Sequence, residues 1–158
     1  MSNIQSKSIP MFGGVTMTSA ATVFGTVDTL GFDFCEIDLI AGTGAAASTA
    51  VTTLQLCEDD TAPTAYADGS PVTALVGAAA VSTSAGFVLP ALSSTKQNVY
   101  RFNVDLKGRK RYLGINFAPT LQTVGVSCVA RLSSAADGVD CTRTPAITVA
   151  GNRLVANA

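Results

Sequence analysis

The residues best placed to do chemistry lie in the segment VYRFNVDLKGRKRYLGINFAP, residues 99–119. Four cations, Lys107, Arg109, Lys110 and Arg111, fall within five consecutive positions. Such a cluster could hold a phosphate, contact nucleic acid or face a protein partner. A phosphate loop is excluded, because the cluster has one glycine, no Ser or Thr, and strand-like rather than helical sequence after it.

Nucleic acid is a poor partner for the rest of the chain. Without these four residues, six basic residues remain of the ten, against eleven acidic ones, a balance of −5. That surface would repel a polynucleotide beyond the cluster, and Tyr112 is the single interleaved aromatic residue. The four cations are therefore predicted to form an exposed turn that faces either solvent or a protein partner.

No other residues form a catalytic constellation. The chain has no histidine, which removes the commonest general base and the commonest zinc ligand. Residues 57–60 (CEDD) and Asp68 form the only acidic cluster, which could in principle hold calcium. They lack the D-x-D-x-D-G spacing, so an exposed strand end that leads into a turn is favoured. We expect no enzyme activity, no cofactor and no metal site.

Four cysteines, Cys35, Cys57, Cys128 and Cys141, show no C-x-x-C spacing, which disfavours zinc binding and thioredoxin-like chemistry. The first three lie in strand-like segments and are predicted to be buried free thiols. A disulfide between Cys128 and Cys141 is the alternative. Reduced cysteines are consistent with a cytoplasmic environment.

The composition indicates a surface that a partner covers. Charged residues make up 13% of the chain, against about 25% in typical soluble domains. Desolvating such a surface costs little, because charge is the expensive group to bury. No apolar run of 18 residues is present, so no membrane contact is expected. The first ten residues do not have the pattern of a secretory signal.

Short alternating segments predict an all-β fold, an antiparallel β-sandwich of the jelly-roll type. The expected domain covers residues 31–134, preceded by an extended N-terminal arm (1–30) and followed by a C-terminal tail or terminal strand (135–158). The predicted strands of the domain are residues 32–40, 51–58, 99–106, 111–118 and 123–132, with a short edge strand at 87–92.

The basic cluster is expected to cap a β-hairpin. Apolar residues alternate on both sides of it, and directly opposed residues of an antiparallel pair share a face. Pairing Leu106 with Leu113 also sets Val104 against Ile115 and Phe102 against Phe117. This register leaves residues 108–111 as a four-residue loop, with the cations at its tip.

The segments FDFCEIDLIAGTG, TTLQLCEDD, FNVDLKGRKRYLGINFAP and VGVSCVARLS together give the chain a likeness to a known family. Over roughly residues 30–134 it resembles the small head decoration (cement) proteins of tailed bacteriophages. The resemblance implies a β-sandwich, often trimeric, that binds the major capsid protein on the outside of the shell and stabilises it. The implied location is the exterior of a virion.

Two other functions remain open. A β-sandwich module of a phage tail or a cell-surface adhesin would bind carbohydrate or protein, using exposed aromatic residues such as Tyr66 or Tyr112. A nucleic-acid-associated protein would show a salt slope of about −3.6 for four phosphate contacts.

Overall fold

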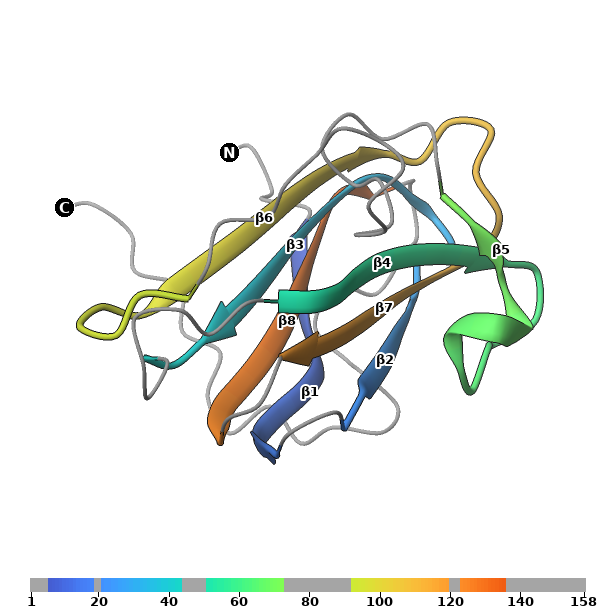
Figure 1. The fold of residues 1–158 in the computed structure, drawn as a ribbon. Helices are drawn as coiled ribbons and strands as arrows, with labels where there is room; N and C mark the ends of the chain where they lie inside the picture. Colours follow the sequence, from blue (N-terminus) through green and yellow to red (C-terminus); the bar gives the residue numbers. More distant parts are fainter. Residues whose placement is uncertain (1–5, 19–20, 44–50, 73–91, 120–122, 136–158) are drawn as a thin grey trace, which may run out of the picture.

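The computed structural model describes residues 6–18, 21–43, 51–72, 92–119 and 123–135, and these are almost entirely β-structure (Figure 1). The only helical segment among them is one 3-10 turn, Tyr66–Asp68. The eight strands are β1 (Ser6–Met17), β2 (Val23–Asp28), β3 (Phe32–Ala41), β4 (Val51–Asp59), β5 (Ser70–Pro71), β6 (Asn98–Asp105), β7 (Tyr112–Pro119) and β8 (Val124–Ala135).

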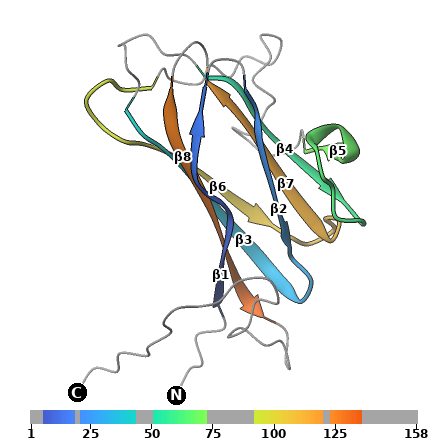
Figure 2. The same cartoon turned by 90° about the horizontal axis from the view of Figure 1, so that it is seen from below.

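The strands form two four-stranded antiparallel sheets that lie as separate layers (Figure 2). Sheet A has the order β1-β8-β3-β6 and sheet B the order β2-β7-β4-β5. Every consecutive pair of strands except β4 and β5 lies in opposite sheets. Eight strands wound in this order make a jelly roll, so the predicted antiparallel sandwich of jelly-roll type is confirmed.

The core lies between the sheets, and alternation along each strand fills it. In β3, Cys35, Ile37 and Leu39 are at most 1% exposed, while Glu36 and Asp38 point outward. The same period of two buries one face of β6 and β8, whereas β7 is buried on both faces except at Tyr112 and Asn116. The predicted strands 32–40, 51–58 and 123–132 correspond to β3, β4 and β8.

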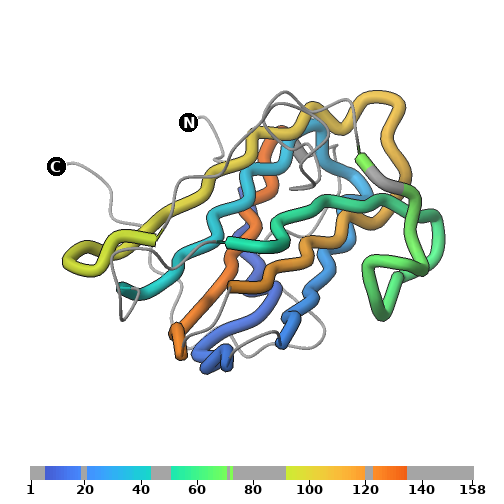
Figure 3. The backbone as a smooth tube through the Cα atoms, viewed as in Figure 1, coloured from blue at the N-terminus to red at the C-terminus, as the bar shows by residue number. Residues whose placement is uncertain are grey.

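The predicted hairpin is wrong. β6 pairs with β3, with Phe102 opposite Ile37, and β7 pairs with β2 and β4, with Leu113 opposite Val27. The pairs Leu106–Leu113, Val104–Ile115 and Phe102–Phe117 therefore do not exist as cross-strand neighbours. The two strands alternate as predicted, but their apolar faces point into the core from opposite sheets. Residues 106–111 cross from one sheet to the other (Figure 3).

The described part of the predicted N-terminal arm belongs to the sandwich. β1 pairs with β8 in sheet A, and β2 pairs with β7 in sheet B. This corrects the expectation of an arm for the residues of β1 and β2. The predicted tail beyond residue 135 and residues 87–91 of the predicted edge strand lie outside the described residues.

At the edge where β1 approaches β2, the two strands lie close together at a glycine. Gly25 of β2 is buried, and a Cβ atom there would lie 2.7 Å from Phe12 Cδ1 and 2.8 Å from the Met11 carbonyl oxygen. The backbone of β1 therefore occupies the space that any side chain at this position would need.

Candidate functional site

The basic segment 107–111 lies at one end of the sandwich, and most of its cations contact the protein itself. The Arg111 guanidinium donates two hydrogen bonds to Asp28 at the end of β2, at 3.1 and 2.7 Å. It also lies over the Tyr112 ring, 5.0 Å from the centroid. The hydrogen bond from Arg111 holds the pKa of the Asp28 carboxyl below its usual value.

Arg109 and Lys110 contact sheet B at the same end. Arg109 Nη1 lies 3.6 Å from Glu58 Oε2, and both side chains are about four-fifths buried, with exposures of 20% and 17%. Glu58 stands opposite Leu113 on the inward face of β4, and its Oε2 has no hydrogen-bond partner among the described residues. Lys110 Nζ donates to Ser70 Oγ at 3.2 Å. Arg109 is thus the counter-ion of a carboxylate at the rim of the core.

Backbone hydrogen bonds fix the crossover in place. The Arg111 carbonyl accepts from both the N–H and the hydroxyl of Thr29, at 2.9 and 2.6 Å. The Leu106 N–H donates to the Asp33 carbonyl at 2.9 Å, and Gly108 takes a φ of 73° that favours glycine. Of the four predicted partner-binding residues, Lys107 is exposed and its side chain has no partner in the described part of the chain. Arg111 is also exposed, but like Arg109 and Lys110 it contacts a side chain of sheet B. Contact of the cluster with a partner stays a prediction.

The acidic cluster shapes a turn. Asp68 Oδ2 accepts hydrogen bonds from Thr64 N, Thr64 Oγ1 and Ala65 N at 3.0, 2.7 and 2.8 Å. Asp59 Oδ1 accepts from Thr61 N at 3.0 Å. Within the described part of the chain, no three His, Cys, Asp or Glu residues are placed to hold a metal ion. These carboxylates lie at a strand end that leads into a turn, the arrangement the sequence favoured.

Three thiols are buried and free, as predicted. Burial raises the pKa of Cys35 and Cys128 to about 12 and that of Cys57 to about 11. A thiol reacts as its thiolate, so these groups are inert at neutral pH. Cys128 is a free thiol here, and Cys141 lies outside the described residues.

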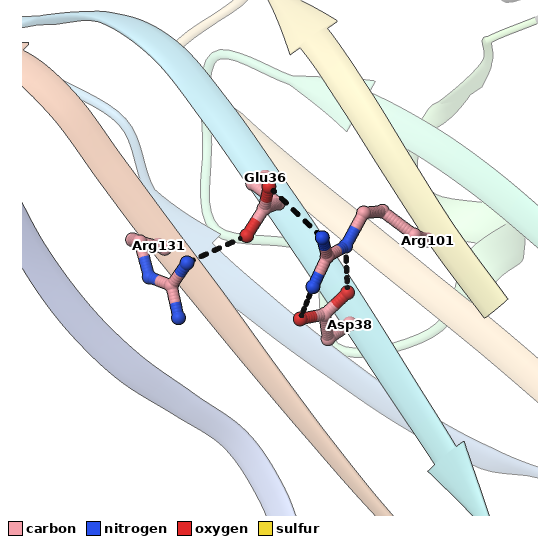
Figure 4. A network of polar contacts seen from close by, with 4 residues as sticks. All are labelled: Glu36, Asp38, Arg101 and Arg131. Atoms are coloured by element: carbon pink, nitrogen blue, oxygen red, sulfur yellow. Dashed lines mark hydrogen bonds and ion pairs between the residues drawn. The ribbon is translucent and has the colours of Figure 1, made fainter. Parts of the chain in front are cut away.

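The outer face of sheet A carries a charge network that sequence reasoning missed (Figure 4). Arg101 Nε and Nη2 each lie 2.7 Å from an oxygen of Asp38, directly across the β3–β6 ladder. Arg101 Nη1 also lies 3.7 Å from Glu36, and Arg131 Nη1 donates to Glu36 at 2.8 Å from β8. The hydrogen bond from Arg101 lowers the pKa of Asp38. The alternation in the sequence predicts that Glu36 and Asp38 face outward, but it does not predict their arginine partners, which come from distant segments of the chain.

The network balances two carboxylates against two guanidinium groups, so the centre of this face carries no net charge. Each Arg is about half exposed, with values of 51% and 56%. In the described segments, no helix is long and apolar enough to cross a membrane.

Comparison with known proteins adds a likeness in fold. No protein-family model matches the sequence, and no curated protein matches it. The structure is similar to a chain in the "Structure of infectious bursal disease virus Gx strain", with a TM-score of 0.51 and 11% sequence identity. The match covers 87% of this chain and 34% of that one, so this protein spans about a third of the length of that viral chain. The likeness is one of fold.

Proposed function

We propose that the protein is a structural component of a virus particle that binds the outer surface of the capsid and stabilises the shell. The observation that carries this proposal is the jelly-roll strand order of the two sheets. Jelly rolls occur in viral capsid proteins as well as in lectins and cupins. The fold likeness to a chain from a virus structure supports the viral choice.

The chemistry of the described surface supports a structural role. Two arginines of the crossover and two arginines of the sheet A face are each paired with a carboxylate, and the described thiols are buried. A surface whose charges are already compensated loses less hydration free energy when a neighbouring protein covers it. Modest contacts suffice on a shell, because a multivalent protein gains avidity from repeated sites.

The proposed partners are the major capsid protein and two further copies of this chain. A homotrimer that engages three equivalent sites would bind far more tightly than one copy alone. Lys107 is exposed and, within the described residues, its side chain has no ion pair or hydrogen bond, so it is the residue of the basic cluster that we assign to the shell contact. The proposed location is the exterior of the virion, after assembly in the host cytoplasm.

The alternative of a sugar- or protein-binding module uses exposed aromatic residues, of which Tyr66 and Tyr112 are the examples named from the sequence. Both side chains are half-buried, and the Arg111 guanidinium covers the Tyr112 ring. Neither tyrosine offers the open ring on which a sugar would stack, so the described structure does not favour these residues as a binding site.

The test is a binding experiment with capsids stripped of this protein. Purified tagged protein is added, and bound and free fractions are separated on a density gradient. The proposal expects saturable binding at a fixed number of copies per shell, and sedimentation of the free protein at three times the 16.0 kDa chain mass. Lys107→Glu is expected to weaken binding, with Lys96→Glu, a second exposed lysine, as the control. Protein that remains at the top of the gradient with intact shells below would refute the proposal.

A further inference from the structure

A shallow, open depression lies on the outer face of sheet A. It lies between β3 and β6 and measures about 350 Å³, at the small end of the about 300–1,000 Å³ typical of ligand pockets. Its lining comes from three strands: Phe34, Cys35 and Glu36 of β3, Asn103, Val104 and Asp105 of β6, and Ser133 of β8. None of the crossover cations lines it.

Phe34 provides an open aromatic surface in this depression. Its side chain is 45% exposed, although it belongs to a strand whose other face is fully buried. Phe34 pairs with Asp105 on one side and with Ser133 on the other, so polar side chains flank the ring along one row of the sheet. It is the only aromatic residue among the three large exposed hydrophobic residues of the described chain. An aromatic face flanked by polar groups suits a ligand with both an apolar face and hydroxyl groups.

The flanking groups can both donate and accept hydrogen bonds. The Asn103 side chain is exposed and makes no hydrogen bond within the described residues. Asp105 Oδ1 accepts from the Lys107 N–H at 3.0 Å, which leaves its second oxygen for a ligand. The Ser133 hydroxyl can act in either direction. A ligand hydroxyl is also a donor and an acceptor, so neighbouring hydroxyls on one ring match this set.

The charges around the depression favour a neutral ligand. Glu36, the second carboxylate of the lining, is already held by Arg131 at 2.8 Å and lies 3.7 Å from Arg101. A cationic ligand would compete with two guanidinium groups for Glu36 and would have only the exposed Asp105 carboxylate left to pair with, and an anionic ligand would meet Asp105 and Glu36 together. A neutral polyhydroxyl compound escapes both costs.

We propose that this depression binds a single neutral sugar residue, with the Phe34 ring against the C–H face of the sugar and with Asn103, Asp105 and Ser133 bonded to its hydroxyls. This inference concerns a different surface from the crossover and goes beyond the stabilisation of a capsid. A protein on the outside of a particle could use such a site to hold glycans.

The test is NMR titration of the full-length, ¹⁵N-labelled protein with glucose, galactose, mannose and N-acetylglucosamine. Concentrations should reach about 20 mM, since a shallow single-ring site is expected to bind in the millimolar range. For at least one sugar, the proposal expects saturable shifts at the Asn103 side-chain amide and at residues 34, 105 and 133. Phe34→Ala is expected to weaken this binding about tenfold or more, because it removes the stacking surface.

Val99→Ala is the matched control, because Val99 is similarly exposed, at 57%, on the same sheet but does not line the depression. This variant should bind the sugar as the wild type does. The inference is overturned if no sugar of the panel shifts the signals of these residues, or if Phe34→Ala binds as tightly as the wild type. It is also overturned if, in the same titration, only the charged sugars glucosamine or glucuronate bind. Failure here would leave capsid binding on the density gradient unaffected, so the two proposals are tested separately.

Discussion

Replacing Gly25 with alanine is expected to destabilise the sandwich where β1 approaches β2. A Cβ atom at this position would lie 2.7 Å from Phe12 Cδ1, 2.8 Å from the Met11 carbonyl oxygen and 3.0 Å from the Met11 carbonyl carbon. Two of these three contacts are backbone atoms, so relief requires β1 to move and to strain its ladder with β8. We expect a loss in the free energy of unfolding near the upper end of the about 1–3 kcal/mol usual for overpacking.

Thermal melting followed by circular dichroism measures this effect. For a domain of this size, 1 kcal/mol corresponds to about 2–4 °C, so Gly25→Ala should melt about 5–10 °C below the wild type. Gly13→Ala is the matched control in β1, because a Cβ atom there meets nothing within 4 Å. That variant should be unchanged or more stable by about 0.4–1 kcal/mol, through the loss of unfolded-state entropy. Equal melting temperatures for the two variants would refute the close approach of β1 and β2.

Three further predictions follow from the ionisable groups. Arg109→Ala should lower the free energy of unfolding by about 1–3 kcal/mol, because it leaves the buried Glu58 carboxylate without its counter-ion. Arg101→Ala on the exposed face should lower it less in a urea titration of both variants, because water screens an exposed ion pair, and equal losses would contradict the difference in burial. The three buried thiols should resist Ellman's reagent at about pH 8 until urea unfolds the chain. Burial raises the pKa of these thiols above 9.0 in the folded state only, so the unfolded chain loses these protons first as the pH rises. The urea midpoint of unfolding should therefore fall between pH 9 and 11. A midpoint that stays constant over this range would argue against burial of the thiols. Arg111 holds the pKa of Asp28 below 3.8 in the folded state, so stability from this pair is present above that pH and lost below it. Asp28→Asn should therefore reduce the loss of stability in acid, as measured by urea midpoints on both sides of that pH.

The strands were predictable where apolar and polar residues alternate without interruption. Cys35, Ile37 and Leu39 all face the core, as their spacing indicates. β1 escaped detection because its register with β8 shifts between Pro10 and Phe12 and again before Val15, which breaks the period of two. The sequence predicts an extended segment there, but it does not predict that this segment pairs with β8 in sheet A.

Strand pairing was not predictable from alternation alone. The period of two shows which side chains face the interior, but not whether two consecutive strands share a sheet or face each other across the core. Leu106 and Leu113 are both buried, and both arrangements satisfy that fact. For the same reason, the exposed position of Lys107 could be anticipated, whereas the pairing of Arg111 with Asp28, 83 residues away, could not.

The central claim, that this protein reinforces a capsid from the outside, is tested most directly by the melting temperature of shells with and without it. Calorimetry of stripped capsids, before and after the purified protein is added back, measures this difference. The account predicts that the shell transition rises as the sites fill and stops rising at saturation. A shell transition that stays at the same temperature with the protein fully bound would contradict it.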